Sequence, residues 1–234
     1  MSKVWRLSQL GYRVEKVIFI ACSDASQGSM PRGGSQAGLV VAIAGSRPLV
    51  EEEAPASLVE SASTRIKRVV RSSLGAELAA ANVAMEHGEF VRAAWAEMTE
   101  KQFEWSSWKI HAAKWPLYLV LDAKTGYDVL KREMVPSDRR TAIDAAALRQ
   151  TFHEDEYAVF VKWVPGPQLC ADSLTKAVGN PMLEKLMVSG LMGLVETEDV
   201  RQERARQRAV KKARKVASRD VPESQPNTPP VGLE

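Results

Sequence analysis

The stretch VIFIACSDASQGS, from Val17 to Ser29, decides the fold. Its first half, Val17–Cys22, is an apolar run of strand length and therefore predicts a buried strand. The run leads directly into Asp24, which small residues flank on both sides. An aspartate in such a place often starts a turn by hydrogen bonding to its own backbone. The role of Asp24 therefore depends on which side chains the other strands place beside it.

Apolar runs and helix-favouring segments follow one another along the rest of the chain. Strands are expected at Ala37–Ala44, Leu117–Asp122 and Glu156–Val164, with weaker candidates at Ala56–Val59 and Arg65–Val70. Helices are expected from Ser72 or Ser73 to about Met98, and over Tyr127–Met134, Arg139–Thr151, Leu169–Ala177 and Met182–Leu191. This order predicts an α/β (α+β) domain in which helices flank a five-stranded mixed sheet.

Composition limits the classes of function. The 234 residues carry a net charge of +3, but residues 201–234 hold nine Lys or Arg against four Asp or Glu, so the basic character lies in the tail. No apolar run reaches the length of a membrane span. Cys22 and Cys170 lack metal-ligand spacing and the three histidines are scattered, which argues against a disulfide framework and a zinc site.

The chain divides by composition into three parts. Residues 1–16 form a lead-in, residues 17–194 a folded domain, and residues 195–234 a basic tail that is helix-favouring at first and Pro-rich at its end. The cysteine usage and the lack of a secretory leader predict an intracellular protein, in the cytoplasm or the nucleus. The tail is a candidate nuclear localisation signal at residues 211–215 (KKARK), a non-specific nucleic-acid binder, or a solvated segment.

Four carboxylates stand where a site is expected. Asp24 and Asp122 each end an apolar strand, Glu77 lies in the first turns of the long helix among small residues, and Asp172 follows the last strand. In open α/β sheets, sites form outside the carboxyl ends of strands. Clustered carboxylates repel one another unless a cation joins them, and a ligand set of oxygens favours Mg²⁺ or Mn²⁺. Taken singly, each acid also fits a helix cap or a solvated face.

The motifs around these acids resemble a known family. The segments SDAS, SSLGAEL, LVLDAKTGYDVL and WVPGPQLCADSLTK occur in the order seen in the type 1 ribonuclease H domain of Copia-type retrotransposon polyproteins. The resemblance runs from about Leu10 to about Leu194, and the last segment is its most specific part. Residues 140–144 (RTAID) also resemble a helix of that family.

This resemblance implies a ribonuclease H-like fold and a two-metal mechanism. Asp24, Glu77, Asp122 and Asp172 would hold two Mg²⁺ ions, with Mn²⁺ as a substitute, for hydrolysis of the RNA strand of an RNA–DNA hybrid. Asp24 would bridge both ions, Glu77 and Asp122 would hold the ion on the leaving-group side, and Asp172 the ion on the water side. The products would carry a 3′-hydroxyl and a 5′-phosphate. A reverse transcriptase domain is the implied upstream partner, and residues 1–16 would be the end of its connection.

Several positions depart from the family pattern. The residue after the third acid is Ala123 where the family has Asn, and Ala142 stands where the family has His. Gln27-Gly28 replaces a Trp, and Leu78 replaces the Tyr after the second acid. These departures leave open an alternative function, in which the chain is a catalytically degenerate, nucleic-acid-binding remnant of the same domain.

Two other classes of protein fit these residues less well. Integrase-type transferases share the broad fold but have a Glu as their last acid, whereas the last acid here is Asp172. A nucleotide-binding doubly wound domain is expected to carry a Gly-rich phosphate loop after its first strand, and SDASQGS is not such a loop.

A basic segment precedes the helix that carries Glu77. Lys67 and Arg71 are expected to contact phosphates of the hybrid, and Ser72 and Ser73 add hydroxyl donors. The alternative is an ordinary edge strand, in which Lys and Arg discourage aggregation.

Overall fold

The computed structural model describes residues 17–51, 53–132, 134–152, 157–178 and 180–195, together with residues 202, 205, 206 and 210. The chain divides into two units, Met1–Thr197 and Glu198–Glu234, and the sheet belongs to the first. The predicted lead-in over residues 1–16 and the candidate nuclear signal at residues 211–215 lie outside the described residues. Within the described part, no helix combines the length and the apolar character needed to cross a membrane.

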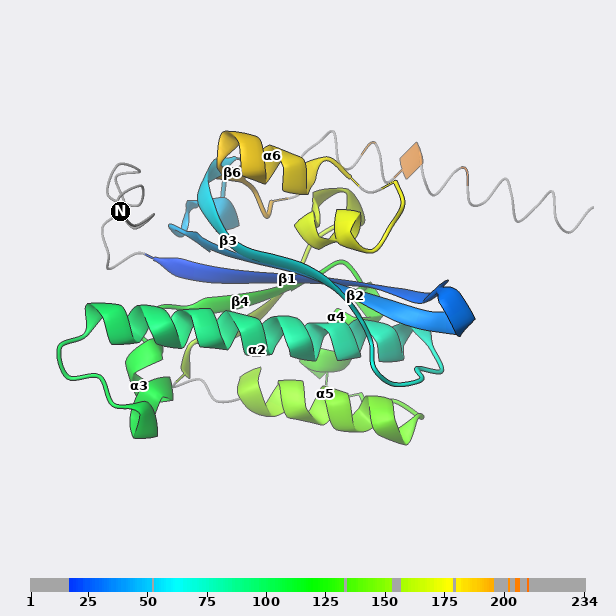
Figure 1. The fold of residues 1–234 in the computed structure, drawn as a ribbon, viewed down its shortest axis with the longest axis horizontal. Helices are drawn as coiled ribbons and strands as arrows, with labels where there is room; N and C mark the ends of the chain where they lie inside the picture. The colour runs from blue at the N-terminus through cyan, green and yellow to red at the C-terminus, as the bar shows by residue number, and fades with distance from the viewer. Residues whose placement is uncertain are drawn as a thin grey trace, which may run out of the picture. The chain divides into compact units, whose positions relative to one another are not determined.

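A six-stranded mixed sheet organises the first unit (Figure 1). Its strands are β1 (Ile18–Met30), β2 (Gly34–Ala44), β3 (Ala54–Arg65), β4 (Leu117–Leu121), β5 (Val159–Trp163) and β6 (Leu191–Met192). They lie in the order β5-β4-β1-β2-β3-β6, with β1, β4 and β5 parallel to one another and the remaining pairs antiparallel. The expected α/β class is confirmed, but the expected count of five strands is wrong, because two-residue β6 is too short to show a period in the sequence.

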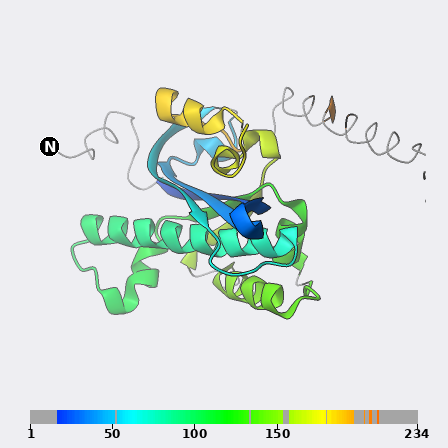
Figure 2. The same ribbon diagram turned by 45° about the vertical axis from the view of Figure 1, so that its right-hand side comes forward.

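Helices cover both faces of the sheet, as Figures 1 and 2 show. The first face packs against α2 (Ser73–Thr99), α3 (Trp108–Ala112), α4 (Lys124–Arg132) and α5 (Arg139–Phe152). The second packs against α6 (Met182–Ser189) and the short 3₁₀ helix η7 (Cys170–Leu174). Along β1, successive side chains enter these two cores in turn, with Phe19 in the first and Ile20 in the second. Burial on both sides explains the unbroken apolar run that opens β1.

The first strand is longer than the sequence predicts. Pairing of β1 with β2 continues from Ile18↔Ala44 to Ser26↔Gln36, past the apolar run and into its polar continuation. Backbone hydrogen bonds extend the hairpin there although the apolar run has ended: Ser23 and Asp24 are still buried, and the side chains become exposed only after Ser26. Asp24 therefore lies within a strand, opposite Gly38, and the turn expected over residues 27–36 shrinks to the 3₁₀ turn Pro31–Gly33.

Two further expectations are corrected. The weak strand candidate at residues 56–59 lies within β3, which pairs with β2 over most of its length, but the candidate at residues 65–70 is wrong, because β3 ends at Arg65. The helix expected over residues 169–177 is the 3₁₀ helix η7. The preceding Pro165-Gly166-Pro167 favours tight turns, and packing on the second core fixes them.

Helix α2 begins where its capping signal lies. The Ser72 hydroxyl accepts a hydrogen bond from the Gly75 N–H at 3.0 Å, which satisfies one of the free amides of the first turn. Farther along, a Cβ at Gly88 would lie 3.0 Å from side chains of Ala21 and Leu117. The small residues of α2 thus let the helix approach β1 and β4 closely, and this approach brings Glu77 to the sheet.

Candidate active site

Asp24 is held at the middle of the sheet. Its neighbour Ser23 pairs with Leu121 of β4, and Asp24 itself pairs with Gly38 of β2. The side chain is 2% exposed, and its Oδ2 accepts a close hydrogen bond from the Thr175 hydroxyl. A carboxylate that is buried on a central strand has little freedom to reorient.

Asp122 follows β4 directly. Because β4 is parallel to β1 and in register with it, the carboxyl end of β4 brings Asp122 beside Asp24. The Asp122 carbonyl oxygen accepts a hydrogen bond from Trp163 Nε1 at 2.9 Å, which fastens the residue to β5. A Cβ at Gly166 would lie 3.0 Å from Asp122 Oδ2, so the glycine leaves room for this carboxylate.

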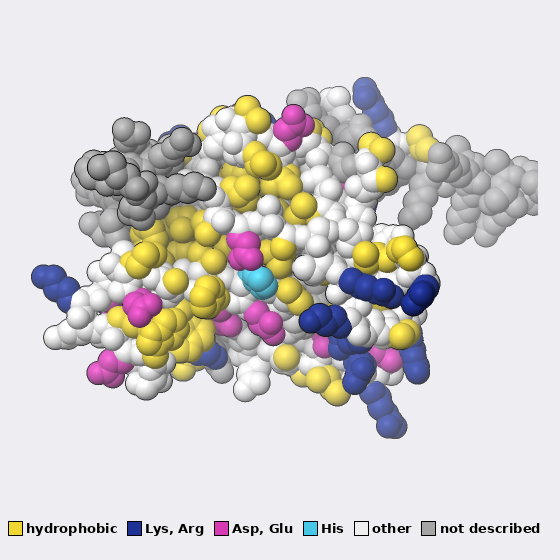
Figure 3. Space-filling view, viewed as in Figure 1, with side chains coloured by type: hydrophobic (Ala, Val, Ile, Leu, Met, Phe, Trp, Pro, Cys, Tyr) yellow, Lys and Arg dark blue, Asp and Glu magenta, His cyan; other side chains and the backbone are white. Residues whose placement is uncertain are grey.

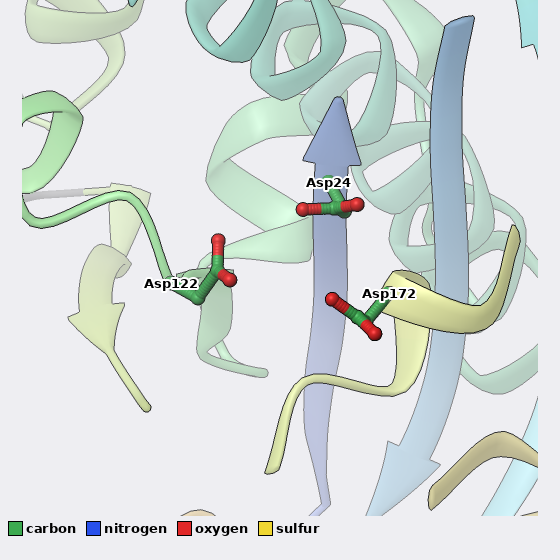
Figure 4. A group of neighbouring side chains, drawn as sticks. All are labelled: Asp24, Asp122 and Asp172. Carbon is green, nitrogen blue, oxygen red and sulfur yellow. The ribbon is translucent and has the colours of Figure 1, made fainter. Parts of the chain in front are cut away.

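Asp172 comes from η7, on the second face of the sheet. Its Oδ1 accepts a close hydrogen bond from the Lys176 ammonium, and its Oδ2 accepts one from the Asn180 N–H at 3.3 Å. One carboxylate oxygen from each of Asp24, Asp122 and Asp172 lies within 4.8 Å of the other two. Figure 4 shows the three side chains facing a common space from β1, from the segment after β4 and from η7.

Glu77 lies beside this group without belonging to it. It comes from α2, on the opposite face of the sheet from η7, and it is not among the acids whose oxygens meet within 4.8 Å. Its Oε2 is buried and has no hydrogen-bond partner among the residues that the structure describes. Burial, together with the charges of Asp24 and Asp122, raises the pKa of Glu77 to about 9.

The other acids are also tuned by burial. Burial and the charge of Asp24 raise the pKa of Asp122 to about 6. Burial raises the pKa of Asp24, although the Thr175 hydrogen bond and the charge of Lys176 oppose that rise. A divalent cation fits this site for two reasons. The neighbouring carboxyls raise one another's pKa, and a cation would supply the positive charge that lets them ionise together. The buried Glu77 Oε2, which has no donor among the described residues, could serve as a further oxygen ligand. All four acids can therefore serve as ligands, and the assignment of each to an ion stays a prediction.

Two residues of the site were missed by the sequence reasoning. Thr175 and Lys176 follow Asp172 closely and bind the carboxylates of Asp24 and Asp172. Burial alone would lower the pKa of Lys176, but the hydrogen bond to Asp172 and the nearby acids raise it. The signal was present in the sequence, because both residues belong to the segment ADSLTK that carries the family resemblance most specifically.

The predicted nucleic-acid residues lie at the start of α2. Arg71 lines a pocket of about 610 Å³ whose other walls are residues 69–70, Gly75 and residues 138–141. The Ser72 hydroxyl accepts the capping hydrogen bond of α2, while Lys67, Arg71 and Ser73 are exposed. Sequence reasoning missed the basic residues at the start of α5, Arg139 and Arg140, which the fold brings to the same pocket.

Exposed basic side chains lie on the elements at this end of α2, and Arg71, Arg139 and Arg140 line the pocket itself. They come from the β1–β2 hairpin, the end of β3, the segment before α2 and the start of α5: Arg32, Arg65, Lys67, Arg71, Arg139 and Arg140. Figure 3 shows Lys and Arg side chains concentrated on this part of the molecule. Segments that are far apart in the sequence thus build one basic surface at the same end of α2 as Glu77.

Comparison with solved structures finds likenesses to ribonuclease H domains. The ribonuclease H1 of the halophilic archaeon Halobacterium salinarum NRC-1 is 17% identical, with 71% of this chain and 98% of that chain covered and a TM-score of 0.39. LC11-RNase H1, solved in complex with an RNA/DNA hybrid, is 13% identical, with 67% and 92% covered and a TM-score of 0.44. The RNase H domain of PFV is 13% identical, with 75% and 93% covered and a TM-score of 0.37.

These likenesses, at 13–17% identity, concern the fold alone. No protein-family model matches the chain, and no curated protein matches it.

Proposed function

We propose that the protein is an endonuclease that hydrolyses the RNA strand of RNA–DNA hybrids with two divalent metal ions. One observation carries this proposal: one carboxylate oxygen from each of Asp24, Asp122 and Asp172 lies within 4.8 Å of the other two, beside the carboxyl end of β4, where its parallel pairing with β1 ends. Each of the three stands in a segment that resembles a Copia-type ribonuclease H motif. Asp24 and Asp172 are buried and Asp122 is half-buried, whereas unpaired surface acids are mostly exposed.

The residues of the chain divide the work at the site. Bound ions supply an activated water and stabilise the leaving oxygen of a phosphodiester. Asp24, fixed on β1, would contact both ions, with Asp122 and Glu77 on the leaving-group side and Asp172 on the water side. The water oxygen bonds to phosphorus while the bond from phosphorus to the 3′-oxygen breaks. The products therefore carry a 3′-hydroxyl and a 5′-phosphate. Mg²⁺ is the proposed ion, with Mn²⁺ as a substitute.

The basic surface around the start of α2 would hold the hybrid. Arg71 and Arg140 line a pocket that is open to solvent and large enough for a phosphate group. Guanidinium groups bind phosphate through two parallel hydrogen bonds, and exposed hydroxyls such as that of Ser73 add donors. Lys67, exposed on the same segment, adds charge without lining the pocket. Such contacts position a duplex over the acids without reading its sequence.

A degenerate remnant is the second candidate. Two observations favour it: Glu77 lies outside the three-carboxylate group, and the family's Asn and His are replaced by Ala123 and Ala142. In this reading, the basic surface still binds nucleic acid while the acids no longer turn over substrate.

The wider setting is part of the proposal. The motifs favour an origin in a Copia-type retrotransposon reverse transcriptase, with a polymerase domain as the upstream partner. An intracellular location, in the cytoplasm or the nucleus, accords with hydrolysis of a reverse-transcription intermediate.

The test is a cleavage assay on a panel of nucleic acids. The protein is mixed with a labelled RNA–DNA hybrid, single-stranded RNA, RNA duplex or DNA duplex, with Mg²⁺ or with a chelator. The proposal expects cleavage of the hybrid alone, in the RNA strand alone, and only with the metal. Asp122→Asn should abolish cleavage. Binding of the hybrid by a folded protein, without cleavage, would establish the remnant function instead.

A further inference from the structure

Lys176 contacts the carboxylates from the position where a bound cation is needed. Its Nζ donates a close hydrogen bond to Asp172 Oδ1 and lies 4.0 Å from Asp24 Oδ2. The two acids come from opposite ends of the domain sequence, and this ammonium lies close to both. The group of acids thus contains one positive charge between two of its carboxylates.

The protein also satisfies the remaining oxygens on that side. Asp172 Oδ2 accepts a hydrogen bond from the Asn180 N–H, and Asp24 Oδ2 accepts one from the Thr175 hydroxyl. Three of the four carboxylate oxygens of Asp24 and Asp172 therefore accept hydrogen bonds from donors in the segment 175–180. By contrast, Glu77 on the other side has a buried oxygen without any partner among the described residues.

We propose that Lys176 is a built-in counter-ion, which stabilises the metal-free site and competes with the divalent ion that binds between Asp24 and Asp172. This inference rests on the proposed metal site and adds a residue that sets how tightly that site holds its ion. An ion that binds there repels the ammonium, so Lys176 must leave Asp172 as the ion arrives and returns when it departs.

The position of Lys176 allows this exchange. Its side chain is 45% exposed, whereas those of Asp24 and Asp172 are 2% and 10% exposed. A lysine has a flexible four-carbon stem and a strongly hydrated head, so it can turn from the acids into water at little cost. The buried acids stay in place while the lysine moves.

The test is Mn²⁺ binding in the absence of nucleic acid, measured by titration calorimetry on the full chain. Lys176→Gln keeps the first two methylenes of the stem and a polar end, and it removes the charge. We expect it to bind Mn²⁺ about tenfold more tightly, which is about 1.4 kcal/mol, because the competing ammonium beside Asp24 and Asp172 is gone. Without metal, the same variant should melt at a lower temperature than the parent.

Two further variants sharpen the result. Lys176→Arg keeps the positive charge and should bind Mn²⁺ as weakly as the parent. Lys114→Gln removes a comparable lysine, which pairs with Glu100 after the far end of α2, and should leave Mn²⁺ binding unchanged. A lysine that merely braces the fold would give the opposite sign, because its loss would loosen the site and weaken Mn²⁺ binding.

The outcomes separate this inference from the proposed function. Tighter Mn²⁺ binding by Lys176→Gln supports the counter-ion role even if no variant cleaves a hybrid. Equal or weaker binding by that variant, with an intact circular dichroism spectrum, overturns the role even if the parent is an active nuclease. Failure of both the parent and the variant to bind Mn²⁺ also overturns it.

Discussion

Replacing Glu77 with Gln should stabilise the metal-free protein, with a gain that grows as the pH rises. Gln has nearly the same shape as Glu and carries no charge. The pKa of Glu77 in the fold is about 9, raised from 4.5 by burial and by the charges of Asp24 and Asp122. A carboxyl whose pKa is raised by folding gives its full contribution to stability below its unfolded pKa and loses that contribution as the pH rises through its folded pKa. Metal-free stability should therefore fall from about pH 4.5 to about pH 9.

The magnitude follows from linkage. At about pH 7, Glu77 is protonated in the fold but ionised in the unfolded chain, which costs about 3 kcal/mol relative to an unperturbed glutamate. The Glu77→Gln variant should recover up to about 3 kcal/mol at that pH and close to nothing at about pH 4, where both states of the parent are protonated. With saturating Mn²⁺ the sign should reverse, because the variant has lost a ligand for the ion.

The assay is urea denaturation followed by circular dichroism at several pH values, with chelator and with Mn²⁺. Glu86→Gln is the matched control, since Glu86 is exposed on the same helix. It should change the pH dependence little. If parent and Glu77→Gln lost the same free energy of unfolding between acidic and neutral pH, the reasoning that Glu77 is a buried, metal-seeking carboxylate would be refuted.

Three other changes have expected outcomes. Gly38→Ala should destabilise the protein by about 1–3 kcal/mol in thermal or urea unfolding, because its Cβ would lie 2.9–3.0 Å from atoms of η7 and the following turn. Gly126→Ala is the control: its Cβ would lie 3.7 Å from its nearest neighbour, so this change should be neutral or stabilising. Thr175→Val should cost about 1–2 kcal/mol and raise the pKa of Asp24 further, because it removes the buried hydrogen bond to that carboxylate, and an unchanged pH–stability profile would contradict this. Arg140→Ala should raise KM for the hybrid several-fold and reduce the salt slope of binding by about one, without changing Mn²⁺ binding; an unchanged salt slope would show that Arg140 contacts no phosphate.

Much of the sheet could be predicted because its central strands have strong local signals. The apolar run before Asp24 and the run before Asp122 both correspond to strands that are buried on both faces. The start of α2 at Ser73 could be predicted as well, since the Ser72 cap forms as expected. What could not be predicted depends on pairing: the polar half of β1 is a strand only because β2 lies beside it, and β6 exists only through β3.

The site divides in the same way. Residue type and position at strand ends are local, so Asp24 and Asp122 could be found from the sequence. That Asp172 meets them depends on the packing of η7 against the second face, and that Glu77 stays apart depends on its approach from the first. Sequence reasoning missed Thr175, Lys176 and Arg140 because a single hydroxyl or charge makes no repeating pattern along the sequence. Only the tertiary contacts show which groups these side chains bind.

The central claim is that Asp24 belongs to a metal site that cleaves RNA. The most direct measurement is single-turnover cleavage of a labelled RNA–DNA hybrid with Mg²⁺, for the parent, Asp24→Asn and the control Glu86→Gln. The parent and the control should cleave the RNA strand and leave 3′-hydroxyl ends, while Asp24→Asn should be slower by on the order of a thousandfold or more at an unchanged fold. Equal cleavage by the parent and Asp24→Asn would contradict the account.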